Sequence, residues 1–337
     1  MSASEFYEYR IAMRPTLRTW LKHSLLLLVT VFTATVAGTL YPFGPLQIFP
    51  DIRVETWSEA LNFLLSLPLY YVQLIVNTVY LLATDAAVLR QGLSFSLSLL
   101  FILTAHESGH YIACRIYGVN ATLPYFIPTP PLIGPAGTFG AFIKILSPMP
   151  SRRATFDIGV AGPIAGFIAL IPVAVLGFLN MREISPEQAA AMQAELIFSD
   201  PLLIRLFAAV FGIDLNLAVA NPFYSAAWLG LLVTALNLIP SGQLDGGHAV
   251  YAVLGERIHF WTGRIAFVVM ALFSVAGFYF YNSPSGFLFA ILLGVMMRVR
   301  HPEPLDDTPL DFKRKIIALL VLLIFILSFV PFPIQIR

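Results

Sequence analysis

A five-residue sequence inside an apolar stretch carries the residue types of a metal-dependent hydrolase. His106, Glu107 and His110 form an H-E-x-x-H pattern. Positions i and i+4 of a helix lie on one face, so both imidazoles can ligate one metal ion while the glutamate reaches a water molecule beside it. The alternative is an ordinary pair of histidines on a helix face. The location argues against that alternative, because ionisable side chains are costly to leave unpaired at membrane depth.

Two imidazoles do not complete a catalytic metal site, which has three protein ligands. The chain has one cysteine, Cys114, so a multi-cysteine site is excluded and the third ligand must be His, Asp or Glu. We favour Asp245, which lies in an apolar region flanked by proline and glycine. Asp245 could instead cap a following helix over 246–254. Asn237, in the same region, could be an amide that packs helices in the membrane.

The composition assigns most of the chain to a lipid bilayer. Of 337 residues, 58% are hydrophobic and 12% are charged, and the mean hydropathy is +0.80. Soluble domains carry roughly twice that share of charge, so a water-soluble monomer is excluded and a polytopic membrane protein is predicted. The formal net charge of +1 argues against a nucleic-acid partner, because no basic surface displaces counterions.

Apolar stretches of about membrane-spanning length predict helices at residues 22–40, 60–84, 93–117, 155–179, 223–244, 260–281, 286–299 and 315–332. Lys and Arg of short loops stay on the cytoplasmic side of a membrane. This rule places the acidic insert 181–222 outside, and we expect the insert to form a surface helix plus a loop. This scheme requires 93–117 to run inward, so 60–84 cannot be an ordinary crossing. We expect Pro68 to break it into a re-entrant or surface element.

The N-terminus favours a retained first helix over a cleaved signal peptide. Basic residues between positions 10 and 22 precede the first apolar stretch over a region that is long for a signal peptide. Glu5 and Glu8 lie among the basic residues, which argues against an organelle transit peptide. We therefore expect a prokaryotic plasma membrane.

Three segments resemble the site-2 protease family of intramembrane zinc metalloproteases, in the branch of plant plastids and prokaryotes that lacks PDZ and CBS domains. They are the H-E-x-x-H pattern, Asn237-x-x-Pro240 with Leu244-Asp245-Gly246, and the run 137–143. The resemblance covers roughly residues 93–255. It implies an all-α polytopic membrane protein with a three-helix catalytic core, peripheral transmembrane helices and a small membrane-associated β-element near 120–150.

The resemblance also implies a division of the chain into three parts. An N-terminal transmembrane or re-entrant region is expected over 1–92. The catalytic core is expected over 93–255 and includes the extracytoplasmic insert. C-terminal transmembrane helices are expected over 256–337.

Residue by residue, the resemblance implies that His106, His110 and Asp245 bind one zinc ion and that Glu107 is the general base. Asn237 is implied to hold the substrate backbone or the developing oxyanion, and Pro240 to shape the break in the chain around it. Zinc is preferred on ligand type, although two histidines and an aspartate are also compatible with iron or cobalt.

The segment 120–150 predicts a second part of the mechanism. Its many prolines exclude a helix, whereas the residues from Thr138 to Ile143 favour an extended strand. A helical substrate has no free backbone amides and must unwind before hydrolysis, and an edge strand can pair with the unwound segment. A plain interfacial loop is the alternative. We expect substrate contacts from the start of the run, at Gly137, Thr138, Phe139 and Gly140.

Gly162 and Gly166, on the next span, are predicted to pack helices closely.

We therefore expect a zinc metalloendopeptidase that cuts a single-pass transmembrane protein within the bilayer, near the cytoplasmic side. A metal-ion transporter would also explain intramembrane His, Glu and Asp. An inactive, substrate-binding relative is disfavoured because the ligands and the base are all present. A prenyl-protein-type endopeptidase would place the third metal ligand differently, and that assignment would not explain the stretch 237–246.

Overall fold

The computed structural model describes residues 14–48, 56–134, 136–191, 196–299 and 301–336. Among the described residues, five helices are long and apolar enough to cross a membrane. These are α2 (Leu17–Ala37), α3 (Trp57–Thr84), α4 (Ala86–Tyr117), α5 (Arg152–Leu179) and α10 (Glu256–Tyr281). Three expected apolar helices are shorter, namely α8 (Pro222–Asn237), α11 (Ser285–Met296) and α12 (Phe312–Ser328). The expectation of a mainly helical, polytopic membrane protein is confirmed.

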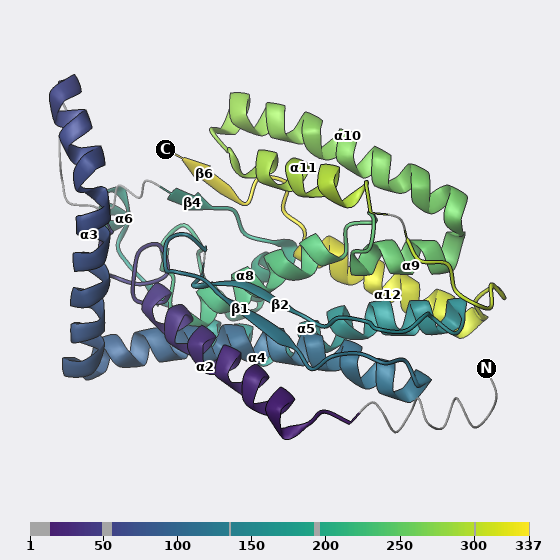
Figure 1. Cartoon of the computed structure of the whole chain (residues 1–337). Helices are drawn as coiled ribbons and strands as arrows, with labels where there is room; N and C mark the ends of the chain where they lie inside the picture. The colour runs from purple at the N-terminus through teal and green to yellow at the C-terminus, as the bar shows by residue number, and fades with distance from the viewer. Residues whose placement is uncertain (1–13, 49–55, 135, 192–195, 300, 337) are drawn as a thin grey trace.

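Helices α4, α5 and α8 pack on one another and form the core of the molecule (Figure 1). Their buried cluster includes the fully enclosed side chains of Phe95, Leu170 and Leu231. Small residues allow the close approach of α4 and α5, because a Cβ on Gly109 would lie 2.4 Å from the carbonyl oxygen of Ala161. The three-helix core therefore rests on close packing between α4 and α5.

Helix α8 is shorter than the apolar pattern predicts, because the chain leaves the helix after Asn237. Gly242 in the connection has φ of +55°, a left-handed conformation that favours glycine. The chain then starts the short helix α9 (Asp245–Leu254), which packs against α5 and α10. The break places Asp245 at the start of a new helix beside the core.

The expected β-element is present. Strand β1 (Tyr125–Pro128) pairs antiparallel with β2 (Thr138–Phe142). The pairing continues beyond β2, since the N–H of Thr122 donates to the carbonyl of Lys144 at 3.0 Å. An extended segment therefore runs on from β2 toward the start of α5.

The acidic insert has more structure than a helix and a loop. It contains α6 (Pro186–Ala191), α7 (Leu202–Phe211) and the short strands β3 (Arg182–Glu183), β4 (Leu196–Phe198) and β5 (Ala218–Val219). Strand β3 pairs with β5, and β4 pairs with the C-terminal strand β6 (Ile334–Ile336). Helix α7 is apolar and buries Leu203 and Ile204 in the core cluster, which explains why the insert folds onto the bundle.

Helix α3 lies crosswise to α4, at the end of the bundle that carries α6 (Figure 1). It does not run alongside the core helices, although its length and composition suffice for a crossing. That 60–84 is not an ordinary crossing stays a prediction. The predicted break at Pro68 is wrong, because α3 continues through that residue. The chain turns instead at Asp85, whose carboxylate accepts from the N–H of Ala87 at 2.8 Å and caps α4.

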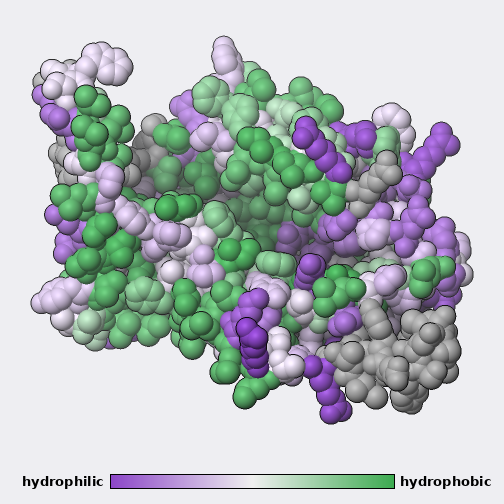
Figure 2. Space-filling view, viewed as in Figure 1, coloured by the Kyte–Doolittle hydropathy of each residue, from purple (hydrophilic) through white to green (hydrophobic). Residues whose placement is uncertain are grey.

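Basic helix ends gather at the opposite end of the bundle. Figure 1 shows that α4 and α11 end there and that α5, α10 and α12 begin there. Hydrophilic side chains cover this end, whereas apolar side chains cover α3 and α10 (Figure 2). Arg10 and Arg300, two of the basic residues expected on the cytoplasmic side, lie outside the described residues. The described part of the pattern agrees with a common side for the basic loops.

Arg314 joins three helices at this basic end. Its guanidinium, on α12, bonds the Asp157 carboxylate of α5 at 2.6 and 2.9 Å and donates to the Tyr117 hydroxyl of α4 at 3.0 Å. It also pairs with Asp311, which caps α12. The network ties the peripheral helix α12 to the core.

We predict that Arg314→Met lowers the free energy of unfolding by about 1–3 kcal/mol, because it leaves the Asp157 carboxylate without its positively charged partner in a partly buried site. The measurement is thermal unfolding in detergent. Arg153→Met, at an exposed position of α5, is the matched control and should unfold like the wild type. Equal midpoints for the two variants would contradict a stabilising role of the network.

Candidate metal centre

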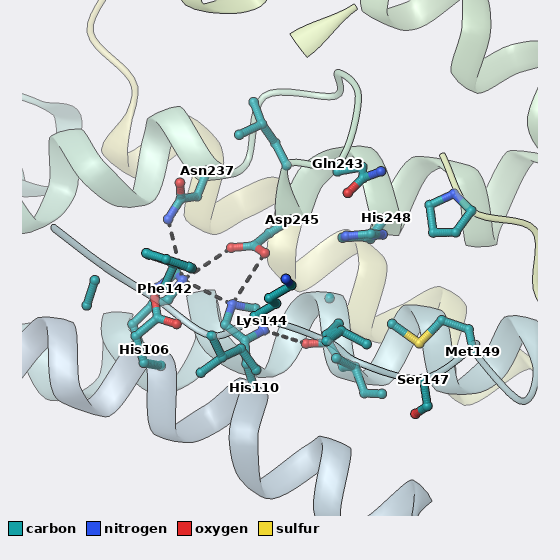
Figure 3. A pocket seen from close by; sticks show the side chains of 18 of the residues that line it. His106, His110, Phe142, Lys144, Ser147, Met149, Asn237, Gln243, Asp245 and His248 are labelled. Atoms are coloured by element: carbon teal, nitrogen blue, oxygen red, sulfur yellow. Dashed lines mark hydrogen bonds and ion pairs between the residues drawn. The ribbon is translucent and has the colours of Figure 1, made fainter. Parts of the chain in front are cut away.

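The structure brings together the three side chains expected to bind a metal ion (Figure 3). His106 Nε2 lies 3.1 Å from His110 Nε2. Asp245 places Oδ2 3.2 Å from His106 Nε2 and Oδ1 3.3 Å from His110 Nε2. Donor atoms bound at about 2.0–2.1 Å around a tetrahedral zinc are about 3.3 Å apart. The triangle of donor atoms therefore fits zinc.

Two separate parts of the fold position these donors. His106 and His110 lie one turn apart on α4, and both are buried. Asp245 is the first residue of α9, and its side chain points toward the two imidazoles (Figure 3). No side-chain cap is formed at the start of α9. The alternative of Asp245 as a helix cap is therefore wrong, and its carboxylate faces the histidines instead.

Helix α5 orients and accommodates the imidazoles. His110 Nδ1 donates to the carbonyl of Ile158 at 2.7 Å, which leaves Nε2 unprotonated and free to ligate. A Cβ on Gly162 would lie 2.1 Å from His110 Nε2, and one on Gly166 would lie 3.1 Å from His106 Cβ. The predicted close packing at Gly162 and Gly166 is confirmed, and it has a local purpose, since both positions make room for the histidines.

A cavity of about 600 Å³ opens beside the three donors. Glu107 lines it and is 6% exposed, and its carboxylate interacts with the backbone amide of Ile143. Asn237 also lines the cavity, with Nδ2 3.4 Å from His106 Nε2. A candidate base and a candidate hydrogen-bond donor thus lie beside the donor triangle. The alternative role of Asn237, an amide that only packs helices, does not account for its position in the cavity beside His106.

Other residues expected to contact substrate do not line the cavity. Gly137 packs against α2, where the Thr33 hydroxyl donates to its carbonyl at 2.7 Å. The Thr138 hydroxyl donates to a carbonyl of β1, and Phe139 is exposed. Gly140 and Pro240 are also absent from the cavity lining among the described residues. A role of these five residues in substrate binding stays a prediction.

Residues 141–145, which continue the same strand, line the cavity instead. The apolar run of this segment, rich in aromatic and β-branched residues and interrupted only by Lys144, and Pro148 after it are the sequence signal for an extended chain here. That signal does not say which end of the strand meets the metal ligands, because the answer depends on how β1, β2 and α4 pack.

We predict that Gly162→Ala weakens zinc binding about 10- to 100-fold, because the added methyl group must displace the His110 ring. The measurement is zinc content after dialysis against a chelator series. Gly294→Ala on α11, where the nearest atom to the new methyl group is a side-chain carbon of Phe267 at 3.3 Å, is the control. Wild-type zinc retention in Gly162→Ala would show that the ring does not need this space.

Comparison with known proteins places this site in a described family. The family model "Peptidase family M50" matches residues 94–277, which is more than half of the chain. The chain is 26% identical over 294 residues to "Probable zinc metalloprotease EGY2, chloroplastic" of Oryza sativa subsp. indica, an alignment that covers 83% of this chain and 51% of that protein.

A second relative is "Probable zinc metalloprotease EGY1, chloroplastic" of Arabidopsis thaliana. The identity is 28% over 248 residues, covering 71% of this chain and 43% of the relative. The chain thus spans about half the length of the curated relatives it matches. Both relatives are named as probable zinc metalloproteases, in agreement with the expected enzyme class and metal ion. Their names place them in chloroplasts, so the expected prokaryotic plasma membrane has no support. The chain is a multi-pass membrane protein that belongs to peptidase family M50, the site-2 protease family.

Proposed function

We propose that the chain is an intramembrane zinc metalloendopeptidase that hydrolyses a peptide bond within or next to the transmembrane segment of a membrane protein, as in regulated intramembrane proteolysis. One observation carries the proposal. Three metal donors and a carboxylate, Glu107, lie together beside a cavity that an extended segment also lines. Peptide hydrolysis needs these groups together, because water, the base and an unwound substrate must meet at one point.

In this proposal His106, His110 and Asp245 hold the zinc ion. A bound zinc ion supplies Lewis-acid chemistry, which lowers the pKa of water toward neutrality and polarises a carbonyl group. The Glu107 carboxylate accepts a proton from the attacking water and returns it to the leaving amine. Asn237 Nδ2 donates to the carbonyl oxygen as negative charge develops on it.

The segment after β2 binds the unwound substrate. Main-chain groups of Lys144 pair with Thr122, and backbone groups alternate sides along an extended chain. Ile143 and Ile145 therefore turn their main-chain groups away from that pairing, toward the cavity that they line. The Ile143 N–H already interacts with the Glu107 carboxylate, so the Ile143 carbonyl and the main-chain groups of Ile145 form the free edge. An extended substrate pairs with this free edge by strand addition.

The substrate is a single-pass transmembrane protein, and the cut lies near the cytoplasmic side. The supporting observation is that α9, which carries Asp245, lies at the basic end of the bundle (Figure 1). Lys and Arg of short loops remain in the cytoplasm. Cleavage that maps to the end carrying the acidic insert would contradict this orientation.

We predict that Glu107→Gln keeps zinc but lowers kcat for a transmembrane substrate about 100- to 10,000-fold, the usual contribution of a general base. Asp245→Ala should lose zinc and activity together. The measurement is zinc content and cleavage in detergent for each variant.

The same variants separate the protease from a metal-ion transporter. A transporter needs the ligands but no base, so Glu107→Gln reconstituted in vesicles would retain zinc flux. Flux in that variant, with no cleavage by the wild type, would favour transport.

We predict that Ile145→Pro raises KM for the substrate about fivefold while zinc content stays at the wild-type level. Proline removes one N–H at the free edge, and a net hydrogen bond contributes about 1 kcal/mol. Ile145→Ala keeps the N–H and removes a similar amount of side-chain packing, so it is the matched control. A KM that rises equally in both variants would attribute the effect to packing and sink the proposed strand pairing.

A further inference from the structure

A histidine that the catalytic proposal does not use lines the cavity. His248 lies on α9, one turn after Asp245, on the wall that also carries Asn237 and Gln243 (Figure 3). This wall and the segment 141–145 both line the cavity. Whatever fills the cavity therefore meets His248 as well as the metal ligands.

Hydrogen bonds determine which nitrogen of His248 carries its proton. His301 Nδ1 lies 2.8 Å from the carbonyl of Pro302, which can only accept, so Nδ1 of His301 donates. In the neutral ring, Nε2 of His301 is then an acceptor, and His248 Nδ1, 2.7 Å away, donates to it. His248 Nε2 is left as an unprotonated acceptor.

Burial favours the neutral form of both rings. Burial is the main cause that lowers the pKa of His248 to about 4 and that of His301 to about 3. No described residue gives His248 Nε2 a hydrogen-bond partner. His248 is half-buried and lines the cavity. Its Nε2 is therefore an acceptor in the wall of the cavity.

His301 is held firmly in place. Its ring stacks on Tyr251 with centroids 4.0 Å apart and an interplanar angle of 9°. The segment that carries it is anchored to the core, since Leu305 N–H donates to the carbonyl of Met149 at 3.0 Å and Arg152 N–H to that of Asp306 at 2.8 Å. This segment lies beyond residues 94–277, the range that matches the family. A part of the chain outside the family match thus sets the tautomer of a residue in the cavity.

An extended substrate needs an acceptor on this wall. If its first edge pairs with Ile143 and Ile145, its second edge points away from that segment, across the cavity. An N–H on the second edge has left water and the substrate helix, and burying it without a partner is costly. A neutral imidazole nitrogen is a suitable acceptor, because it carries no charge that must itself be desolvated.

We propose that His248 Nε2 accepts a hydrogen bond from one backbone N–H of the extended substrate, on the edge turned away from residues 141–145, and that His301 fixes the tautomer required. The ligand is a peptide main chain, so the contact is independent of the substrate's side chains. This inference rests on the proposed peptidase function and adds a substrate-binding residue to it.

The test uses synthetic transmembrane peptides that carry a single N-methyl group at successive positions around the scissile bond. The enzyme is the full chain with zinc in detergent. The wild type should show a penalty of about tenfold in kcat/KM at one position served by His248, besides penalties at positions paired with residues 143 and 145. In His248→Asn the first penalty should disappear and the others should remain.

Two substitutions at His248 separate its two nitrogens. An asparagine places its amide near the position of Nδ1 and keeps the donor to His301, but it removes the acceptor at Nε2. A glutamine places its amide oxygen near the position of Nε2 and should keep the N-methyl profile of the wild type. His301→Gln should likewise keep the profile, because its oxygen can accept from His248, whereas His301→Ala should weaken the His248-dependent penalty.

Several outcomes would overturn the inference. One is a wild-type N-methyl profile in His248→Asn. Another is loss of zinc or a lower melting temperature in both His248→Asn and His301→Ala, which would assign the pair a structural role. If only this inference fails, the wild type still cleaves the peptides and the Glu107→Gln variant does not. A wild type that holds zinc but cleaves no peptide would remove the proposed function together with the inference.

Discussion

Holding ionisable side chains inside an apolar bundle is the constraint on which the rest of the structure depends. Two imidazoles and a carboxylate can remain there only if each faces a partner. The carboxylate of Asp245 must therefore reach α4 from another helix, which requires the chain to break between α8 and α9. The imidazoles also need space, which the glycines of α5 supply. The break and the glycines follow from the same requirement.

The same physical requirement applies to a bound substrate. A transmembrane helix satisfies its own backbone, and unwinding it exposes polar groups where no bulk water can pair with them. A cavity for hydrolysis must therefore offer pairing on both edges of the unwound chain. Here the extended segment 141–145 lines the cavity together with a polar wall that carries Asn237, Gln243 and His248. The metal donors lie beside both, so pairing and chemistry share one space.

The sequence was sufficient for the features that depend on local spacing or on mean hydropathy. The H-E-x-x-H pattern predicts that the two histidines lie side by side, because they are one helical turn apart. The apolar stretches identify the helices because length and composition determine what can cross a bilayer. Asp245 could be chosen because few acids lie in apolar surroundings. The contact between Asp245 and the histidines, separated by 139 residues, could not be derived from spacing and needed the structure.

Features that depend on packing between distant segments were missed or misplaced. Pro68 was expected to break α3, yet the turn comes at Asp85, because a proline within a membrane helix can be tolerated whereas a capped residue starts a new helix. The strand was predicted, but the end of it that lines the cavity was not. His301 carried no local signal, since its role depends on a hydrogen bond to a residue 53 positions away.

The part of the chain beyond residue 277 is therefore more than a peripheral addition to the family core. Arg314 ties α12 to α4 and α5, and the segment at His301 contacts the wall of the cavity through His248. Both contacts lie outside the triangle of metal donors. Changes in this C-terminal part can therefore alter the wall of the cavity while the donors stay in place. The metal centre is confined by its chemistry, whereas these contacts depend on packing between segments that lie far apart in the sequence.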